Sequence, residues 1–141
     1  MSNIDYTMER LENQISWYDS KSINNQRTFK LLKIVEIGAA ALVPVSATMA
    51  MPTAITASLG ILITLLEGLQ HLNQYQHNWI TYRSTCESLK HEKYLYLAKA
   101  GPYASSNDPH VLLAERVESL VSQEHKKWIT GKEHLTKAKE A

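Results

Sequence analysis

Hydrophobic and polar residues are distributed very unevenly along this chain. Residues 37–66 form a run of thirty without a charged side chain, whereas charged and polar residues are frequent on both sides of it. Pro52 stands in the middle of the run, and proline ends one helix and suits the first turn of the next. The pattern therefore predicts two apolar helices joined by a tight turn near 51–53.

The length of these two helices decides whether they cross a membrane. The charge-free legs on either side of Pro52 hold 15 and 14 residues, and a spanning helix needs about 20. A hairpin over 31–72 has legs of 21 and 20 residues, but it then includes Lys33, Glu36 and Glu67. A soluble bundle with a very apolar hairpin is the alternative. A soluble protein of this size has too small a core to bury thirty uncharged residues easily. The run therefore favours a hairpin that crosses a membrane.

The segments that flank the hairpin have helical periodicity. Residues 1–30 predict an amphipathic helix, because apolar side chains recur there at steps of three and four. Residues 73–141 predict a continuation of the second leg to about 100, a loop over 101–108 and a last helix over 109–130. The predicted fold class is thus all-α, a membrane protein with a two-transmembrane helical hairpin and a cytosolic helical collar.

Charge placement predicts the orientation. Arg27, Lys30 and Lys33 precede the first leg and the turn carries no basic residue, so both termini are expected in the cytosol and the protein in the inner (plasma) membrane as a multi-pass protein. The formal net charge of the 141 residues is only +1, which argues against a nucleic-acid partner. The single Cys86 excludes an intrachain disulfide framework.

The sequence lacks the usual signatures of an enzyme or a cofactor site. It contains no glycine-rich phosphate loop, no CxxC pair, no HExxH and no nucleophile elbow. Glu67 and His71 lie four residues apart, but two ligands are weak support for a metal, and an ion pair or hydrogen bond explains them as well. We therefore expect no catalytic residues, no metal and no cofactor.

The second leg carries a stripe of small and polar residues on one helical face. Its members are Thr53, Thr56, Gly60, Thr64, Glu67 and His71. One interpretation is close helix packing, since Thr56, Gly60, Thr64 and Gly68 also form a small-xxx-small run. The other is the wall of a water-filled pore. Both interpretations imply association, because a lipid-facing stripe would leave Glu67 without a partner, and we expect a cyclic homo-oligomer.

Glu36 and Glu67 lie at equal distances from the turn, so a hairpin brings them to the same depth. In a ring of hairpins they would form carboxylate rings, which concentrate cations. The alternative for Glu36 is an ion pair with Lys33, three residues earlier. The nearest neighbours of Glu67 along its own helix include no lysine or arginine. Pro44 removes a backbone hydrogen bond within the first leg and is a candidate hinge.

Short motifs in a fixed order around the hairpin resemble those of a known family. They are Gln14-x-x-Trp17-Tyr18, then Trp79, Arg83, Thr85, Glu87, Leu89, Glu92 and Tyr94, and later Arg116-Val117-Glu118, Glu124 and Trp128. This pattern resembles the SLATT superfamily, the SMODS- and SLOG-associating two-transmembrane effector domains. The resemblance implies a prokaryotic membrane protein that forms pores, in some relatives as the effector of a nucleotide-signalled defence system. Arg83 and Glu87 have the spacing of a helical salt bridge.

Together these features lead to one expectation and one alternative. We expect an ion-conducting oligomeric pore in the lipid bilayer that prefers cations, with Glu67 and the stripe along its path. The alternative is a non-conducting oligomeric scaffold or sensor that the hairpin merely anchors.

Overall fold

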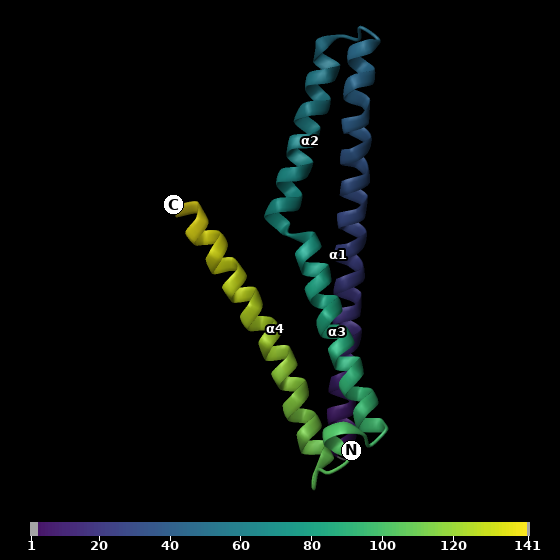
Figure 1. Cartoon of the computed structure of the whole chain (residues 1–141), viewed down its shortest axis with the longest axis vertical. Helices are drawn as coiled ribbons and strands as arrows, with labels where there is room; N and C mark the ends of the chain where they lie inside the picture. The colour runs from purple at the N-terminus through teal and green to yellow at the C-terminus, as the bar shows by residue number, and fades with distance from the viewer. Residues whose placement is uncertain (1–2, 141) are drawn as a thin grey trace. The chain divides into compact units, whose positions relative to one another are not determined.

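The computed structural model describes residues 3–140, and these residues are helical apart from short connections. The elements are α1 (Asn3–Thr48), α2 (Thr53–Asn73), α3 (Tyr75–Leu97), the 3-10 helix η1 (Gly101–Tyr103) and α4 (Pro109–Glu140) (Figure 1). The prediction of an all-α fold is confirmed. The chain divides into two compact units. Residues 21–80 form the hairpin unit, and residues 3–20 together with 81–140 form the terminal unit.

In the hairpin unit, the second half of α1 and all of α2 run antiparallel, side by side (Figure 1). The contact face of α2 contains Leu66 and Gln70, and that of α1 contains Ala39 and Ser46; all four are buried. Inward positions recur at alternating steps of three and four, as in coiled-coil packing. Near the turn, the hydroxyl groups of Ser46 and Thr56 are hydrogen-bonded at 2.8 Å.

The turn is a helix C-terminal motif with a left-handed residue. Ala50 has φ 50°, its N–H donates to the carbonyl of Ala47 at 3.4 Å, and the N–H of Met51 donates to Ser46 at 3.1 Å. This pair of bonds satisfies carbonyls that the end of α1 would otherwise leave free. Pro52 follows, and α2 begins at the next residue.

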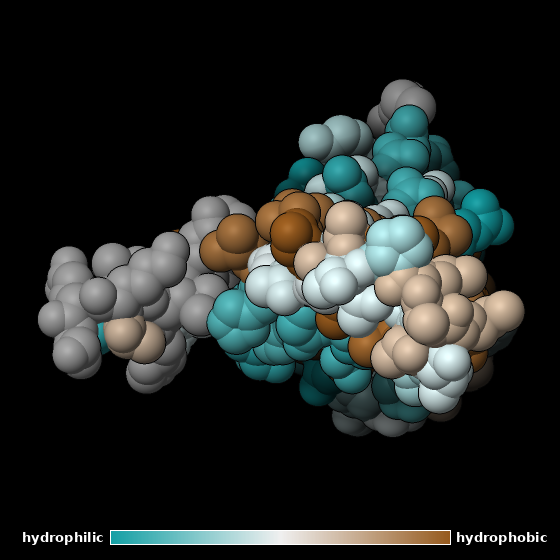
Figure 2. Space-filling view, turned by 90° about the horizontal axis from the view of Figure 1, so that it is seen from above, coloured by the Kyte–Doolittle hydropathy of each residue, from teal (hydrophilic) through white to brown (hydrophobic). Residues whose placement is uncertain are grey.

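Most of the apolar surface of the hairpin is exposed. Both α1 and the chain from Thr53 onward contain an 18-residue apolar window, and only 11% of each window is buried. Ile61 is 61% exposed and Leu65 is 60% exposed. Figure 2, which looks from above, shows mostly brown, tan and white residues where the hairpin faces the viewer. By length and composition, both helices are able to cross a membrane.

The second leg differs from the predicted continuous helix, because it breaks at Gln74. This residue adopts a left-handed conformation with φ 48° and ψ 40°, and its N–H donates to the carbonyl of Gln70. The side-chain Nδ2 of Asn78 donates to the backbone carbonyl of Asn73 at 3.0 Å. Side-chain amides compete with the helix for backbone groups. This polar segment therefore ends α2 although it contains no glycine or proline.

The terminal unit has a small apolar core built from three helices. Its fully buried side chains are Leu11 of α1, Leu89 and Cys86 of α3, and Leu113 of α4. Tyr18, Tyr103 and Val117 complete the cluster. The apolar stripe predicted for residues 1–30 thus supplies one wall of the core. α4 extends beyond the predicted end at 130, because alanine, leucine, lysine and glutamate in its last residues favour helix.

α3 ends in the same motif as α1, with Lys99 in the left-handed position at φ 50°. The N–H of Lys99 donates to Tyr96 at 3.1 Å, and that of Ala100 donates to Leu95 at 3.0 Å. Glycine adopts this conformation without the clash of a Cβ atom.

Lys99→Gly is therefore expected to raise the free energy of unfolding by about 1 kcal/mol. Thermal denaturation of the full chain in detergent micelles, followed by circular dichroism, measures the effect. The matched control is His91→Gly, at an exposed position inside the same helix, where glycine should lower stability. Destabilisation by both substitutions would contradict the expectation.

Candidate functional site

Four polar residues meet where the two legs of the hairpin approach α3. Lys33 and Glu36 lie on α1, and Glu67 and Gln70 lie on α2; we call them the mouth cluster. The Lys33 Nζ donates to Glu36 Oε2 at 3.2 Å and to Glu67 Oε2 at 3.1 Å. The Gln70 Nε2 donates to Glu36 Oε2 at 2.6 Å. Each leg thus supplies one carboxylate, and both cross-leg contacts are charge-assisted.

The two carboxylates of the mouth cluster have different surroundings. The side chain of Glu36 is 15% exposed, against 60% for that of Glu67. Glu36 lies against α2, where Gln70 and Lys33 both donate to it. Glu36 therefore helps to hold the legs together, while Glu67 presents its charge on the surface of the hairpin.

The Lys33–Glu36 pair was the alternative that the sequence offered for Glu36, and the structure contains it. The Lys33–Glu67 pair is not predicted by spacing along one helix, because its two residues lie on opposite legs, 34 positions apart. A signal for it exists in the sequence: Lys33 lies one helical turn from Glu36, and the hairpin places Glu36 and Glu67 at the same depth. A lysine side chain is long enough to reach across at that spacing.

The small and polar stripe of α2 remains largely outside the contact between the legs. Thr53, Gly60, Thr64, Glu67 and His71 are exposed, and only Thr56 is half-buried against α1. A Cβ atom built on Gly60 or Gly68 would meet no other atom within 4 Å. Close packing of the two legs of one chain therefore does not explain the stripe, whose backbone face lies open.

A cavity of about 410 Å³ adjoins the mouth cluster. Its walls include Lys33, Glu67, Gln70, His71 and His77, so Glu67 and His71 border the same cavity. Gln70 is buried and its Oε1 has no hydrogen-bond partner. Among the described residues, no group of three His, Cys, Asp or Glu side chains is placed to hold a metal ion. The cavity thus has a polar lining that includes one carboxylate, one ammonium group and two imidazoles, and such a lining suits water.

Pro44, the candidate hinge, lies inside α1 one turn before its end. The helix continues through it to Thr48, and the nearby Ser46 hydroxyl donates to the carbonyl of Val43 at 2.8 Å. The one interruption within the described second leg is at Gln74 instead. A hinge at Pro44 stays a prediction.

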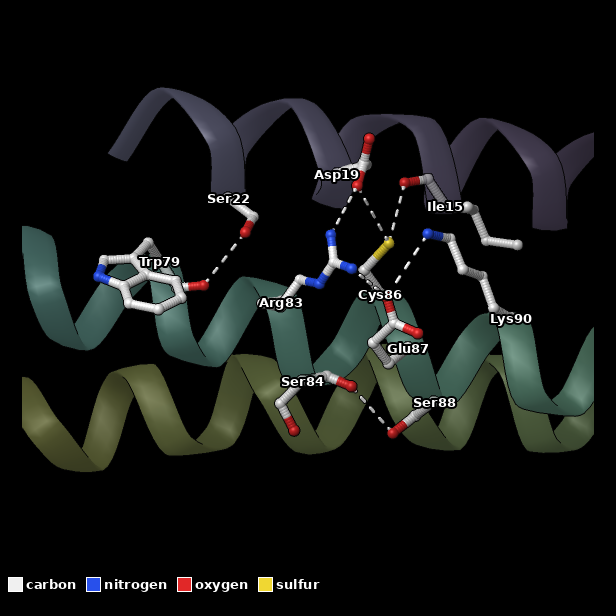
Figure 3. Close-up of polar contacts among 10 residues, drawn as sticks. All are labelled: Ile15, Asp19, Ser22, Trp79, Arg83, Ser84, Cys86, Glu87, Ser88 and Lys90. Atoms are coloured by element: carbon white, nitrogen blue, oxygen red, sulfur yellow. Dashed lines mark hydrogen bonds and ion pairs between the residues drawn. The ribbon is translucent and has the colours of Figure 1, made fainter. Parts of the chain in front are cut away.

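In the terminal unit, Arg83 joins α1 to α3. It forms the predicted ion pair with Glu87 at 2.7 Å and a second one with Asp19 at 3.4 Å. Figure 3 shows its guanidinium between the two carboxylates, with Cys86 beside it. Burial raises the pKa of the Cys86 thiol, which disfavours the reactive thiolate. These residues therefore fit a structural role.

Glu92 is the centre of a second structural network. Its carboxylate accepts hydrogen bonds from Tyr103 at 2.6 Å and from Arg116 at 2.8 Å. Burial, together with this carboxylate, raises the pKa of Tyr103. Arg83, Glu87, Glu92 and Arg116 thus hold the helices of the terminal unit together. The side chain of Trp128 lies outside the described residues.

Comparison with known proteins gives one match. No curated protein and no solved structure matches this chain. Residues 13–110 match a family described as a protein of unknown function, DUF4231. This match spans α1 from residue 13 onward, α2, α3, η1 and the first two residues of α4. The chain therefore belongs to the DUF4231 family.

Proposed function

We propose that this protein is an oligomeric, cation-preferring pore of the inner (plasma) membrane, with both termini in the cytosol. The observation that carries the proposal is the open stripe of α2. This stripe exposes hydroxyl groups, two glycines with no atom close to their Cβ positions, a carboxylate and an imidazole. It lies on a hairpin whose two 18-residue apolar windows are each only 11% buried. The resemblance to the SLATT superfamily supports the same proposal and adds a role as an effector of prokaryotic defence.

Association of several copies follows from the cost of leaving the stripe in lipid. Two helices have no interior that is wide enough for water, so one hairpin cannot surround an ion path. A carboxylate such as Glu67 is expensive to expose to hydrocarbon. A ring of copies removes this cost, because it turns the stripe toward neighbouring copies or toward a central aqueous path.

Cation preference follows from the charges of the mouth cluster. Two carboxylates and one ammonium leave a formal charge of −1 on each copy. Repeated around a ring, this charge attracts cations and repels anions. The exposed Glu67, with Thr64 one turn closer to the hairpin turn, supplies the oxygen atoms that a passing cation would meet.

Reconstitution in planar bilayers tests the proposal. We expect discrete single-channel currents and a reversal potential, under a KCl gradient, that indicates cation preference. Glu67→Gln should lower the permeability ratio of K⁺ to Cl⁻ roughly 30-fold, because one unit charge about 4 Å from an ion in water changes the Boltzmann factor of K⁺ and that of Cl⁻ about fivefold each, in opposite directions.

Glu115→Gln is the matched control, since Glu115 is an exposed carboxylate of the terminal unit. It should leave the ratio unchanged. Wild-type protein that inserts and assembles but carries no current would refute the pore and support a non-conducting scaffold. Currents that are equally selective in both variants would remove Glu67 from the ion path.

A further inference from the structure

We propose that Lys33 sets the charge selectivity of the pore, because its ammonium group occupies the carboxylate that permeant cations would otherwise use. This inference rests on the proposed function and deepens it. In this arrangement Lys33 is a tethered cation that competes with K⁺ or Na⁺ for Glu67.

The contacts of Lys33 place its charge on Glu67. Its Nζ lies 3.1 Å from Glu67 Oε2, on the opposite leg of the hairpin. Among the described residues, Lys33 is the only lysine or arginine within ion-pair distance of Glu67. A cation that approaches Glu67 therefore meets a carboxylate that already has a counter-ion.

The hairpin does not depend on Lys33 to keep Glu36 in place. Gln70 donates to the same Glu36 carboxylate at 2.6 Å, a shorter contact than either of the bonds from Lys33. Apolar packing and the Ser46–Thr56 hydrogen bond also join the legs. The charge of Lys33 is thus removable with the pairing of the legs retained.

Glu67 is placed where a released charge would act on ions. Its side chain is 60% exposed, and it borders the cavity of about 410 Å³ with Gln70. The Gln70 Oε1 is buried beside it and has no hydrogen-bond partner, so the exposed oxygen atoms at this position belong to the Glu67 carboxylate. Without Lys33, the formal charge of the mouth cluster changes from −1 to −2 on every copy.

The test measures reversal potentials for Lys33→Gln in planar bilayers under a KCl gradient. We expect the permeability ratio of K⁺ to Cl⁻ to rise about 30-fold, because removal of one positive charge about 4 Å from the ion in water favours K⁺ and disfavours Cl⁻ about fivefold each. Lys33→Arg keeps the charge and should keep the wild-type ratio. Lys30→Gln removes the same charge one turn earlier on α1, at an exposed position, and should change the ratio less.

A double variant shows whether Lys33 acts through Glu67. In the Glu67→Gln background, Lys33→Gln should no longer raise the ratio, because the carboxylate that it releases is gone. Far-UV circular dichroism shows whether each variant keeps its helices, and the elution volume in size-exclusion chromatography shows whether it assembles. If Lys33→Gln does not assemble, Lys33→Leu removes the same charge with a side chain suited to a membrane boundary.

The outcomes separate this inference from the proposed function. Absence of current from assembled wild-type protein overturns the pore itself. Selective currents with equal ratios for Lys33→Gln and Lys30→Gln overturn the role of Lys33 and leave the pore standing. A rise that persists in the Glu67→Gln background also overturns it, because Lys33 would then act on the pore by another route.

Discussion

Ile61→Lys is expected to remove the protein from the membrane fraction of a bacterial host. Ile61 lies near the middle of α2 and is 61% exposed, so in a bilayer its side chain would face hydrocarbon or a neighbouring copy. A lysine at the centre of a spanning helix costs about 3 kcal/mol, and the favourable term of isoleucine is lost as well. Carbonate-washed membranes, probed for the protein by immunoblot, measure the retained fraction.

Val111→Lys is the matched control for this experiment. Val111 is an exposed apolar residue of α4, in the terminal unit, where a lysine would meet water. This variant should remain in the membrane fraction like the wild type. If the Ile61→Lys protein is instead retained in the membrane fraction like the wild type, the exposed face of the hairpin meets water. That result would refute the membrane hairpin.

Leu89→Ala is expected to lower the free energy of unfolding of the terminal unit by about 2–5 kcal/mol. Leu89 is fully buried, in a cluster with Leu11 and Leu113. Truncation leaves a cavity between three helices, and a core this small has few other side chains to fill it. The near-UV circular dichroism of the tyrosines packed in this core, followed during thermal denaturation of the full chain in micelles, reports the loss.

Leu97→Ala makes the same chemical change in the same helix at a position that is 57% exposed. It should alter stability by only a few tenths of a kcal/mol, as surface substitutions usually do. Equal losses for the two variants would mean that Leu89 does not belong to the stabilising core of this unit.

The features that could be predicted from the sequence depend on long patterns. Thirty uncharged residues and Pro52 indicate the hairpin and its turn, because helix length and proline geometry are general constraints. The stripe that begins at Met8 and Leu11 indicates the wall of the terminal core for the same reason: it repeats with the period of a helix. The pairing of Arg83 with Glu87 follows from spacing alone.

The features that could not be predicted depend on single contacts across helices. Gln74 takes a left-handed conformation that Gly or Asn adopts more easily, so no composition signal marks the end of α2. The contacts of Lys33 with Glu67 and of Arg83 with Asp19 join residues that are 34 and 64 positions apart. Which residue faces which depends on the rotation of each helix, and periodicity in one helix does not fix that rotation relative to another.

The shortness of the turn between α1 and α2 limits how the protein can be controlled. Only residues 49–52 separate the two helices, and none of them carries a charge. In the proposed topology this turn is the part of residues 3–140 that faces the far side of the bilayer, and its four residues offer little surface for a protease, an antibody or an extracellular ligand to bind. In that topology, a soluble ligand or partner protein that controls opening is expected to bind the helices on the cytosolic side.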